Sequence, residues 1–191
     1  SEGTTATEPP GHPLRIPGSR PMAARWGRPS ARLSAMSHDT PALSDSRLDM
    51  LEHTVVRHGR VRSLEEAAAL RGVVPADVIK TMVVRRGEGD HVFVLVPGDR
   101  VIDWVKLRDH LGERRLSMPD ADEAQSVTGY ARGTITPFGA ASDLPVVADT
   151  TIAGHLVSIG GGAHGVSLTV DGTELLEVLA ADVADITKPS S

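Results

Sequence analysis

The residue best suited to chemistry is Lys80, one of three lysines in a chain that carries 20 Lys and Arg. It lies in Val78–Val84, whose side chains would alternate between the two faces of a strand. Both faces are otherwise apolar or nearly so, which is typical of a central strand. Because an unpaired ammonium is costly to bury, Lys80 must reach solvent, be neutral or point into a polar cavity. A strand-end lysine and a functional lysine are both consistent with this pattern.

Two glycine-rich segments could bind an anion or admit a ligand. Gly133–Gly139 has glycine at both ends and Pro137 inside, which favours a rigid loop whose backbone N–H groups converge. Such a loop can form an oxyanion hole without side chains, although a tight crossover between a helix and a strand has the same composition. Gly160–Gly162, with Gly165 close behind, is typical of a bulge or of close backbone approach.

Several other chemistries are excluded by composition or by missing motifs. The chain has no cysteine, so disulfides, thiolate zinc sites and cysteine nucleophiles are ruled out. It contains neither a Walker loop nor a G-x-S-x-G elbow. Its eight histidines form no H-E-x-x-H motif and no close pair, so we expect no metal and no cofactor. His155 and His164 flank the second glycine segment and are expected at the surface.

The charge distribution argues against a general nucleic-acid binder. The formal net charge is −5, and it is uneven, because the first 35 residues carry five arginines against two glutamates. The remainder is acidic, whereas phosphate neutralisation supplies most non-specific affinity for nucleic acids. Aromatic residues make up only 3%, too few for a base-stacking platform. Any contact with RNA should therefore be local and transient.

The composition divides the chain into a tail and one domain. Residues 1–42 are rich in Pro, Gly and Arg and are expected to be disordered, because they cannot bury enough apolar surface. Arg15–Met36 has only a faint similarity to an organellar transit peptide, so a disordered tail is preferred. Residues 43–188 form the expected domain. No apolar run approaches the roughly 20 residues of a membrane span, so we expect no membrane association and a cytoplasmic protein.

Hydrophobic spacing predicts the elements that position these residues. Ser63 with Glu66, and Asp120 with Glu123, are capping boxes that open two helices, ended by Gly72 and Gly129. Interleaved hairpins and helices without regular βαβ alternation predict an α/β fold of the α+β kind, with a mixed, mainly antiparallel sheet and packed helices. Helices are predicted over 64–70, 102–111, 120–129 and 174–180, and strands over 78–84, 91–96, 145–147, 155–159, 166–170 and 183–186.

The order of these motifs resembles the YbaK and prolyl-tRNA-synthetase-associated domain family of editing deacylases. Ser63–Ala68 followed by Val78–Thr81 is similar to the opening of that family. Thr128–Tyr130 leading into Gly133–Gly139 is similar to its G-x-x-x-P loop, and Gly161-Gly162 with Gly165 is similar to its late glycine turn. The resemblance covers about 145 residues, from about Leu43 to Thr187, and implies a YbaK-like editing-domain fold.

The resemblance implies a free-standing enzyme that hydrolyses the ester of misacylated tRNA, with Cys- or Ala-tRNA of the proline type as substrate. Lys80 would hold the aminoacyl-adenosine end, and the Gly133–Pro137 backbone would stabilise the oxyanion. Gly161 and Gly162 would let the terminal adenosine approach. The expected catalytic residues are Lys80, Gly133, Thr136 and Pro137, and the expected substrate-binding residues are Thr81, Tyr130, Phe138, Gly139, Gly161 and Gly162.

The resemblance also bears on mechanism and partners. An aminoacyl ester is already activated, so we expect positioning and oxyanion stabilisation to suffice, with water or a substrate group as nucleophile. Gly160 stands where several relatives carry a polar residue, and His155 or His164 could substitute for it. The partners implied are the 3′ end of misacylated tRNA and an aminoacyl-tRNA synthetase. Two alternatives stay open: a non-catalytic module that binds an aminoacyl nucleotide or the tRNA end, and an interaction protein with its tail as a tether.

Overall fold

The computed structural model describes residues 40–191. The tail expected over residues 1–42 therefore lies outside the described residues, except for its last three. Those three residues are part of the domain, because Thr40 and Ala42 are buried and a 3-10 helix, η1, runs over Pro41–Ser44. A second 3-10 helix, η2, follows over Ser46–Met50.

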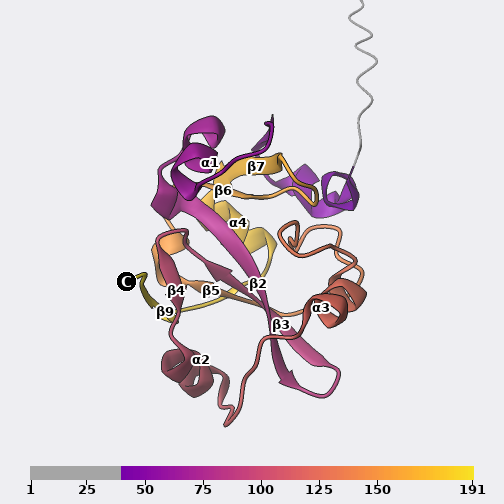
Figure 1. Ribbon diagram of the computed structural model, residues 1–191, viewed down its shortest axis with the longest axis vertical. Coiled ribbons are helices and arrows are strands. Elements are labelled where there is room, and N and C mark those ends of the chain that lie inside the picture. The colour runs from indigo at the N-terminus through magenta and orange to yellow at the C-terminus, as the bar shows by residue number, and fades with distance from the viewer. Residues whose placement is uncertain (1–39) are drawn as a thin grey trace, which may run out of the picture. The chain divides into compact units, whose positions relative to one another are not determined.

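The centre of the fold is a seven-stranded sheet with β2 as its middle strand (Figure 1). The strand order is β1-β7-β6-β2-β3-β5-β8, so segments distant in sequence become neighbours. The predicted central strand around Lys80 is thus confirmed, and so is the edge strand near the C-terminus. The strands are β1 (His53–Arg57), β2 (Val78–Gly87), β3 (Asp90–Val96), β5 (Val146–Asp149), β6 (Leu156–Gly160), β7 (Val166–Asp171) and β8 (Asp182–Ala184).

The sheet is mixed and mainly antiparallel, as predicted. The antiparallel pairs β1–β7, β2–β3 and β6–β7 have five, seven and five residue pairs in register. The parallel pairs β2–β6, β3–β5 and β5–β8 have only two, three and three. The short parallel pairing of β2 with β6 joins the two halves of the sheet.

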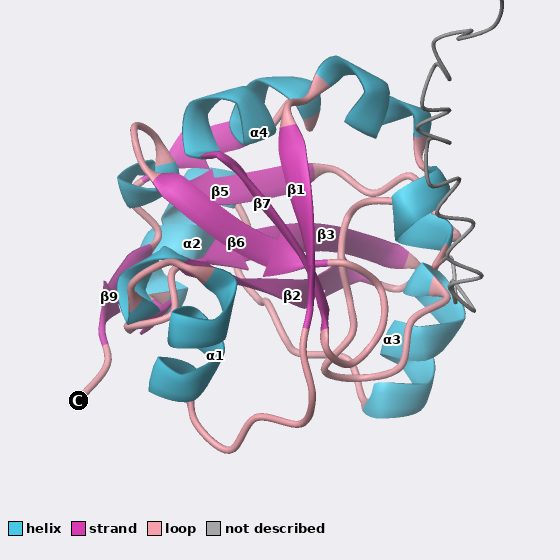
Figure 2. Cartoon of the chain, turned by 90° about the horizontal axis from the view of Figure 1, so that it is seen from above, coloured by secondary structure: helices cyan, strands magenta, loops and turns pink. Residues whose placement is uncertain are grey.

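Helices pack on both faces of the sheet. Leu175 and Leu176 of α4 join the larger core with Leu168 and Val170 of β7. Helix α1 lies on the opposite face, where the Thr169 hydroxyl donates to a carbonyl of α1 (Figure 2). A smaller core forms between α2 and the other face of β2 and β3. The helices are α1 (Leu64–Arg71), α2 (Trp104–Leu111), α3 (Ala121–Thr128) and α4 (Gly172–Val178), with 3-10 helices η3 (Pro75–Asp77) and η4 (Thr150–Ile152).

The predicted caps are present. The Ser63 hydroxyl accepts from the Glu66 N–H at 3.1 Å, and an Asp120 oxygen accepts from the Glu123 N–H at 2.8 Å. The capping box of Ser63 and Glu66 is modified, because the Glu66 carboxylate accepts from the N–H of Arg62 and not from the N–H of Ser63. Gly72, Gly112 and Gly129 end their helices in the left-handed conformation, which costs glycine little.

Two parts of the fold differ from the prediction. The helix predicted from residue 102 begins at Trp104, because Asp103 caps it and Arg100–Ile102 forms β4, which pairs with β9 (Thr187–Pro189) in a separate two-stranded sheet. Strand β1 was not predicted, since it is an exposed edge strand with no clear alternation. Over residues 40–191, no helix is both long and apolar enough to cross a membrane.

Candidate active site

A cavity of about 610 Å³ opens where β2 and β6 separate. β2 pairs with β6 only at Val78 and Ile79, and further along Arg85 exchanges backbone hydrogen bonds with Ser117 on the same side. Because strand residues two apart direct their backbone groups to the same side, the N–H and C=O groups of Thr81 and Val83 face this open edge. The cavity therefore runs along a strand edge whose backbone groups are available to a ligand.

The cavity is lined by five segments that the fold brings together. The floor is β2, and one side is the segment that enters α3 together with the helix's first turn. The other side is formed by the start of the Gly133–Gly139 loop, the end of β6 and the last residue of α1. The lining residues outside β2 are Arg71, Met118, Pro119, Asp120, Ala121, Ala124, Arg132, Gly133, Ile135 and Gly160.

Lys80 lines this cavity, and its ammonium is held by the backbone. Nζ donates to the carbonyl oxygens of Gly98 at 3.2 Å and Arg100 at 2.6 Å. An ammonium has three donors, so one remains after these two bonds. Burial lowers the pKa of Lys80, while the carboxylate of Asp99 acts in the opposite direction. Lys80 is therefore a half-buried residue of the cavity lining whose ammonium is fixed by two backbone carbonyls.

Thr81 supplies a second polar group. Its hydroxyl is buried and has no hydrogen-bond partner among the described residues, although Thr81 lines the cavity. A buried hydroxyl without a partner costs stability and calls for an explanation, and a ligand in the cavity would supply the missing partner for Thr81. The neighbouring residues Ile79 and Val83 belong to the larger core, which fixes the strand on that face.

Only the first half of the Gly133–Gly139 loop reaches the cavity. Gly133 and Ile135 line it, and no acceptor within residues 40–191 contacts the backbone N–H of either. The N–H of Thr134 is already used, because it donates to Ala131 O at 3.0 Å. Gly133 has φ of +89°, a conformation that side chains disfavour. The loop therefore offers at most two backbone donors, Gly133 and Ile135.

The second half of the loop is packed into the protein. Phe138 and Thr136 are fully buried, and the hydroxyl of Thr136 has no partner among the described residues. The Tyr130 hydroxyl donates to the Phe138 carbonyl at 2.7 Å, and burial raises the pKa of Tyr130 to about 12. Pro137 and Gly139 bond to η2 and its cap residue. The structure thus separates Thr136, Tyr130 and residues 137–139 from the cavity at which Lys80, Thr81 and Gly133 meet.

Asp45 and Arg47 hold this packed half, and no sequence signal indicated either residue. Asp45 Oδ2 accepts from the Gly139 N–H and from Arg47, each at 2.6 Å. Arg47 also donates to the Pro137 carbonyl at 2.7 Å and lies 5.4 Å from the centre of the Phe138 ring. The bond from Arg47, assisted by that from Gly139, lowers the pKa of Asp45 to about 2 against the effect of burial.

The three consecutive glycines have different roles. Gly161 is buried, and a Cβ there would lie 2.7 Å from a Val166 methyl carbon. Gly162 has φ of +86°, and its Cβ would lie 2.9 Å from the Tyr130 ring. Only Gly160 lines the cavity, and a Cβ there would meet its nearest atom at 3.5 Å, an ordinary contact. Close packing therefore explains Gly161 and Gly162, whereas Gly160 leaves space for a ligand.

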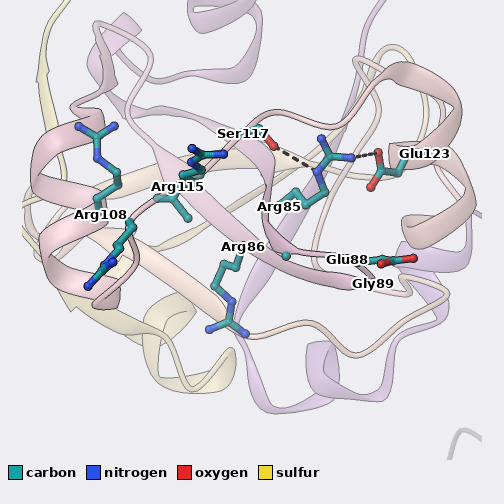
Figure 3. Close-up of a pocket in the computed structure, with 11 residues that line it drawn as sticks. Arg85, Arg86, Glu88, Gly89, Arg108, Arg115, Ser117 and Glu123 are labelled. Carbon is teal, nitrogen blue, oxygen red and sulfur yellow. Dashed lines mark hydrogen bonds and ion pairs between the residues drawn. The ribbon is translucent and has the colours of Figure 1, made fainter.

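Two further cavities flank the fold. One of about 510 Å³ adjoins the first and contains His164, whose ring lies beside Gly133. His155 lies elsewhere, 3.4 Å from Asp77. The other, of about 650 Å³, lies at the far end of β2 and is lined by five arginines (Figure 3). In the part of the chain that the structure describes, no group of three or more His, Asp or Glu could hold a metal ion.

Comparison with known sequences places the cavity within a matched region. The profile of the aminoacyl-tRNA editing domain matches residues 58–178, which include β2, the Gly133–Gly139 loop and the glycine turn. A proline–tRNA ligase from Geobacter sp. (strain M21) is 38% identical over 93 residues, or 49% of this chain. A proline–tRNA ligase from Heliobacterium modesticaldum is 36% identical over 107 residues. The matches cover only 16% and 18% of these ligases.

Solved structures agree with this comparison. A proposed trans-editing enzyme for prolyl-tRNA synthetase is 28% identical, with a TM-score of 0.66 and coverage of 71% of this chain and 87% of that one. A hypothetical protein of known structure is 27% identical, with a TM-score of 0.65 and coverage of 72% and 92%. In both comparisons the agreement extends over most of each chain. By sequence and by fold, the chain belongs to the aminoacyl-tRNA editing domain family.

Proposed function

We propose that this chain hydrolyses the ester bond of misacylated tRNA, with Ala- or Cys-tRNA of the proline type as substrate. The observation that carries the proposal is a cavity lined by Lys80, whose ammonium is fixed, by Thr81, whose hydroxyl has no partner among the described residues, and by Gly133 and Ile135, whose backbone N–H groups contact no described acceptor. Hydrogen-bond donors of this kind stabilise the negative charge that develops on the carbonyl oxygen of an ester under attack.

The net reaction adds one water molecule across the ester. The nucleophilic oxygen attacks the carbonyl carbon, and the electron pair of the C=O bond moves to its oxygen. The N–H groups of Gly133 and Ile135 stabilise this oxyanion, while the third donor of Lys80 holds the aminoacyl-adenosine end. The bond to the ribose oxygen then breaks, the ribose oxygen takes a proton, and free amino acid and tRNA are released. Because an aminoacyl ester is already activated, positioning and charge stabilisation suffice without a covalent enzyme intermediate.

The cavity favours a small amino acid attached to a large, polar group. Its wall of Ile79, Val83 and Ala124 is apolar and suits a short aliphatic side chain, whereas the edge of β2 presents polar backbone groups. The related ligases and the related trans-editing enzyme are named for the proline system, which supports tRNA of that type. A synthetase would supply the charged tRNA, and the reaction belongs in the cytoplasm, where translation takes place.

The test is release of amino acid from a panel of charged tRNAs, led by Ala- and Cys-tRNA of the proline type. Lys80→Ala should lower kcat/KM for release roughly 10- to 100-fold, the range for losing a hydrogen bond from a charged group to the substrate. Lys80→Gln keeps a hydrogen-bond donor for the carbonyls of Gly98 and Arg100 but removes the charge. A loss of activity in this variant with an intact fold therefore reports on function and not on structure. Lys106→Ala is the matched control, since Lys106 pairs with Asp185 at the surface.

The outcomes separate the hypotheses. Release by the wild type that depends on Lys80 and not on Lys106 supports the deacylase and identifies the substrate. Full activity of Lys80→Ala, with its fold intact by circular dichroism, would show that the reaction does not need Lys80. Saturable binding of the tRNA end without release above spontaneous hydrolysis would make the chain a binding module.

A further inference from the structure

The second cavity, of about 510 Å³, is lined without any acidic side chain. Its ionisable residues are Arg60, Arg71, His58 and His164. This is unusual for the domain, because residues 40–191 carry 15 Lys and Arg against 22 Asp and Glu. The cavity shares Arg71, Gly133 and Gly160 with the first cavity, so the two cavities adjoin, and the second has no acidic side chain in its lining.

Arg71 is the residue that distinguishes this end. It is the last residue of α1, it is half-buried, and it lines both cavities. Its Nε donates to His58 Nε2 at 3.2 Å, and His58 Nδ1 lies 2.8 Å from the Gly59 carbonyl. The carbonyl can only accept, so His58 carries its proton on Nδ1 and Nε2 is free to accept from Arg71. His58 therefore orients the guanidinium without neutralising it.

Arg71 forms no ion pair with a carboxylate from any described residue, and its terminal nitrogens have no described acceptor. Three of the other half-buried arginines are paired with carboxylates: Arg47 with Asp45, Arg85 with Glu123 and Arg86 with Asp90. Arg100 instead donates to Thr187, and Arg108, at the arginine-rich cavity, has no carboxylate partner among the described residues. Burial alone lowers the pKa of Arg71, with no opposing contribution from a nearby carboxylate. A half-buried cation that lacks a counter-ion is destabilising unless a ligand supplies the anion.

We propose that Arg71 binds a phosphodiester of the substrate, the 5′ phosphate of the terminal nucleotide, while the amino acid occupies the first cavity. This rests on the proposed function. The ester and the 5′ phosphate belong to the same nucleotide, and Gly133 and Gly160 border both cavities, so one nucleoside can lie across them. The planar guanidinium can donate two parallel hydrogen bonds to phosphate oxygens. Arg60, at the same cavity, adds positive charge toward the preceding nucleotide.

The arginine-rich cavity in Figure 3 is a weaker candidate for the same role. Arg85 and Arg86 there are already paired with carboxylates, and Glu88 also lines it. Its residue Arg85 lies about 16 Å along β2 from Lys80, because it is five positions further along the strand. Arg115 in that cavity is exposed and serves as a matched control.

The experiment compares wild type, Arg71→Ala, Arg71→Lys and Arg115→Ala on two substrates. One is Ala-tRNA, and the other is alanyl-adenosine, which has the ester but no phosphate. We expect Arg71→Ala to lower kcat/KM for Ala-tRNA by roughly 10- to 100-fold, the range for hydrogen bonds to charged groups, and to leave alanyl-adenosine unchanged. Arg71→Lys should be intermediate, and Arg115→Ala should match wild type on both. An equal loss on both substrates, or no loss on Ala-tRNA, would overturn the proposal.

A binding measurement keeps this test independent of catalysis. A fluorescent CCA trinucleotide should bind Arg71→Ala more weakly than wild type, and the slope of log affinity against log salt should fall by about 0.7, as for one lost contact to a single-strand phosphate. If wild type binds the trinucleotide in this way but releases no amino acid, the deacylase proposal fails while the phosphate site stands. Equal affinity and equal salt slope for wild type and Arg71→Ala would refute the phosphate site.

Discussion

The contact between η2 with its cap residue and the Gly133–Gly139 loop can be tested by replacing Asp45 with asparagine. The Asp45 carboxylate is only 10% exposed and bonds to Arg47 and to the N–H of Gly139. Asparagine resembles protonated aspartate in size, but it cannot form the ion pair. The substitution therefore removes the charge while leaving the packing around Phe138 in place.

The loss of unfolding free energy expected for Asp45→Asn follows from the shift in the pKa of Asp45. These bonds lower the pKa of Asp45 from 3.8 to about 2, and each pKa unit corresponds to about 1.4 kcal/mol. The charged form therefore contributes about 2 kcal/mol to the free energy of unfolding at neutral pH. Since the folded-state pKa is the lower one, this contribution is fully present above about pH 5. It is lost as the pH falls through 4 toward 2, and about half should be gone near pH 3.

Urea denaturation of wild type and Asp45→Asn between pH 3 and pH 7 measures this directly. We expect a difference of about 2 kcal/mol at pH 7 that narrows to about 1 kcal/mol at pH 3. Asp49→Asn, an exposed residue of the same 3-10 helix, should show almost no difference at either pH. A difference that stays constant with pH, or an equal loss in Asp49→Asn, would refute the assignment of this stability to the Asp45 ion pair.

Three other substitutions test the roles assigned to the loop and the glycine turn. Gly160→Val should fold normally but lower kcat/KM at least 10-fold, because its side chain would enter the cavity; unchanged kinetics would contradict this. Gly161→Ala should lower the free energy of unfolding by about 2 kcal/mol in urea, because its Cβ would collide with Val166; a stable variant would show that the strand can shift. Tyr130→Phe leaves the buried Phe138 carbonyl without its donor and should cost about 1 to 2 kcal/mol in the same assay, and a cost near zero would argue against that bond.

Local features of the fold were predictable because they depend on residues a few positions apart. The caps at Ser63 and Asp120 satisfy backbone donors three residues on, and the helices end at glycines that adopt positive φ. Alternation along Val78–Val84 likewise marked a central strand around Lys80. Strand β1 was missed because an exposed edge strand has no buried face to impose alternation.

The composition of the site depended on contacts between distant segments. The sequence indicated Lys80 and the Gly133–Gly139 loop, but it could not show that only Gly133 and Ile135 reach the cavity. That division is set by Asp45, which lies 94 positions before its partner Gly139 and anchors the far end of the loop.

The sequence by itself therefore determined the elements, the central strand and the segments from which the site is built. The tertiary structure decided where the cavity opens, since that follows from the separation of β6 from β2 after two residues of pairing. It also decided that Arg71 has no counter-ion, because no described carboxylate from another segment reaches it. Caps and alternation are local preferences, whereas a cavity and an unpaired charge are properties of segments that meet only in the folded chain.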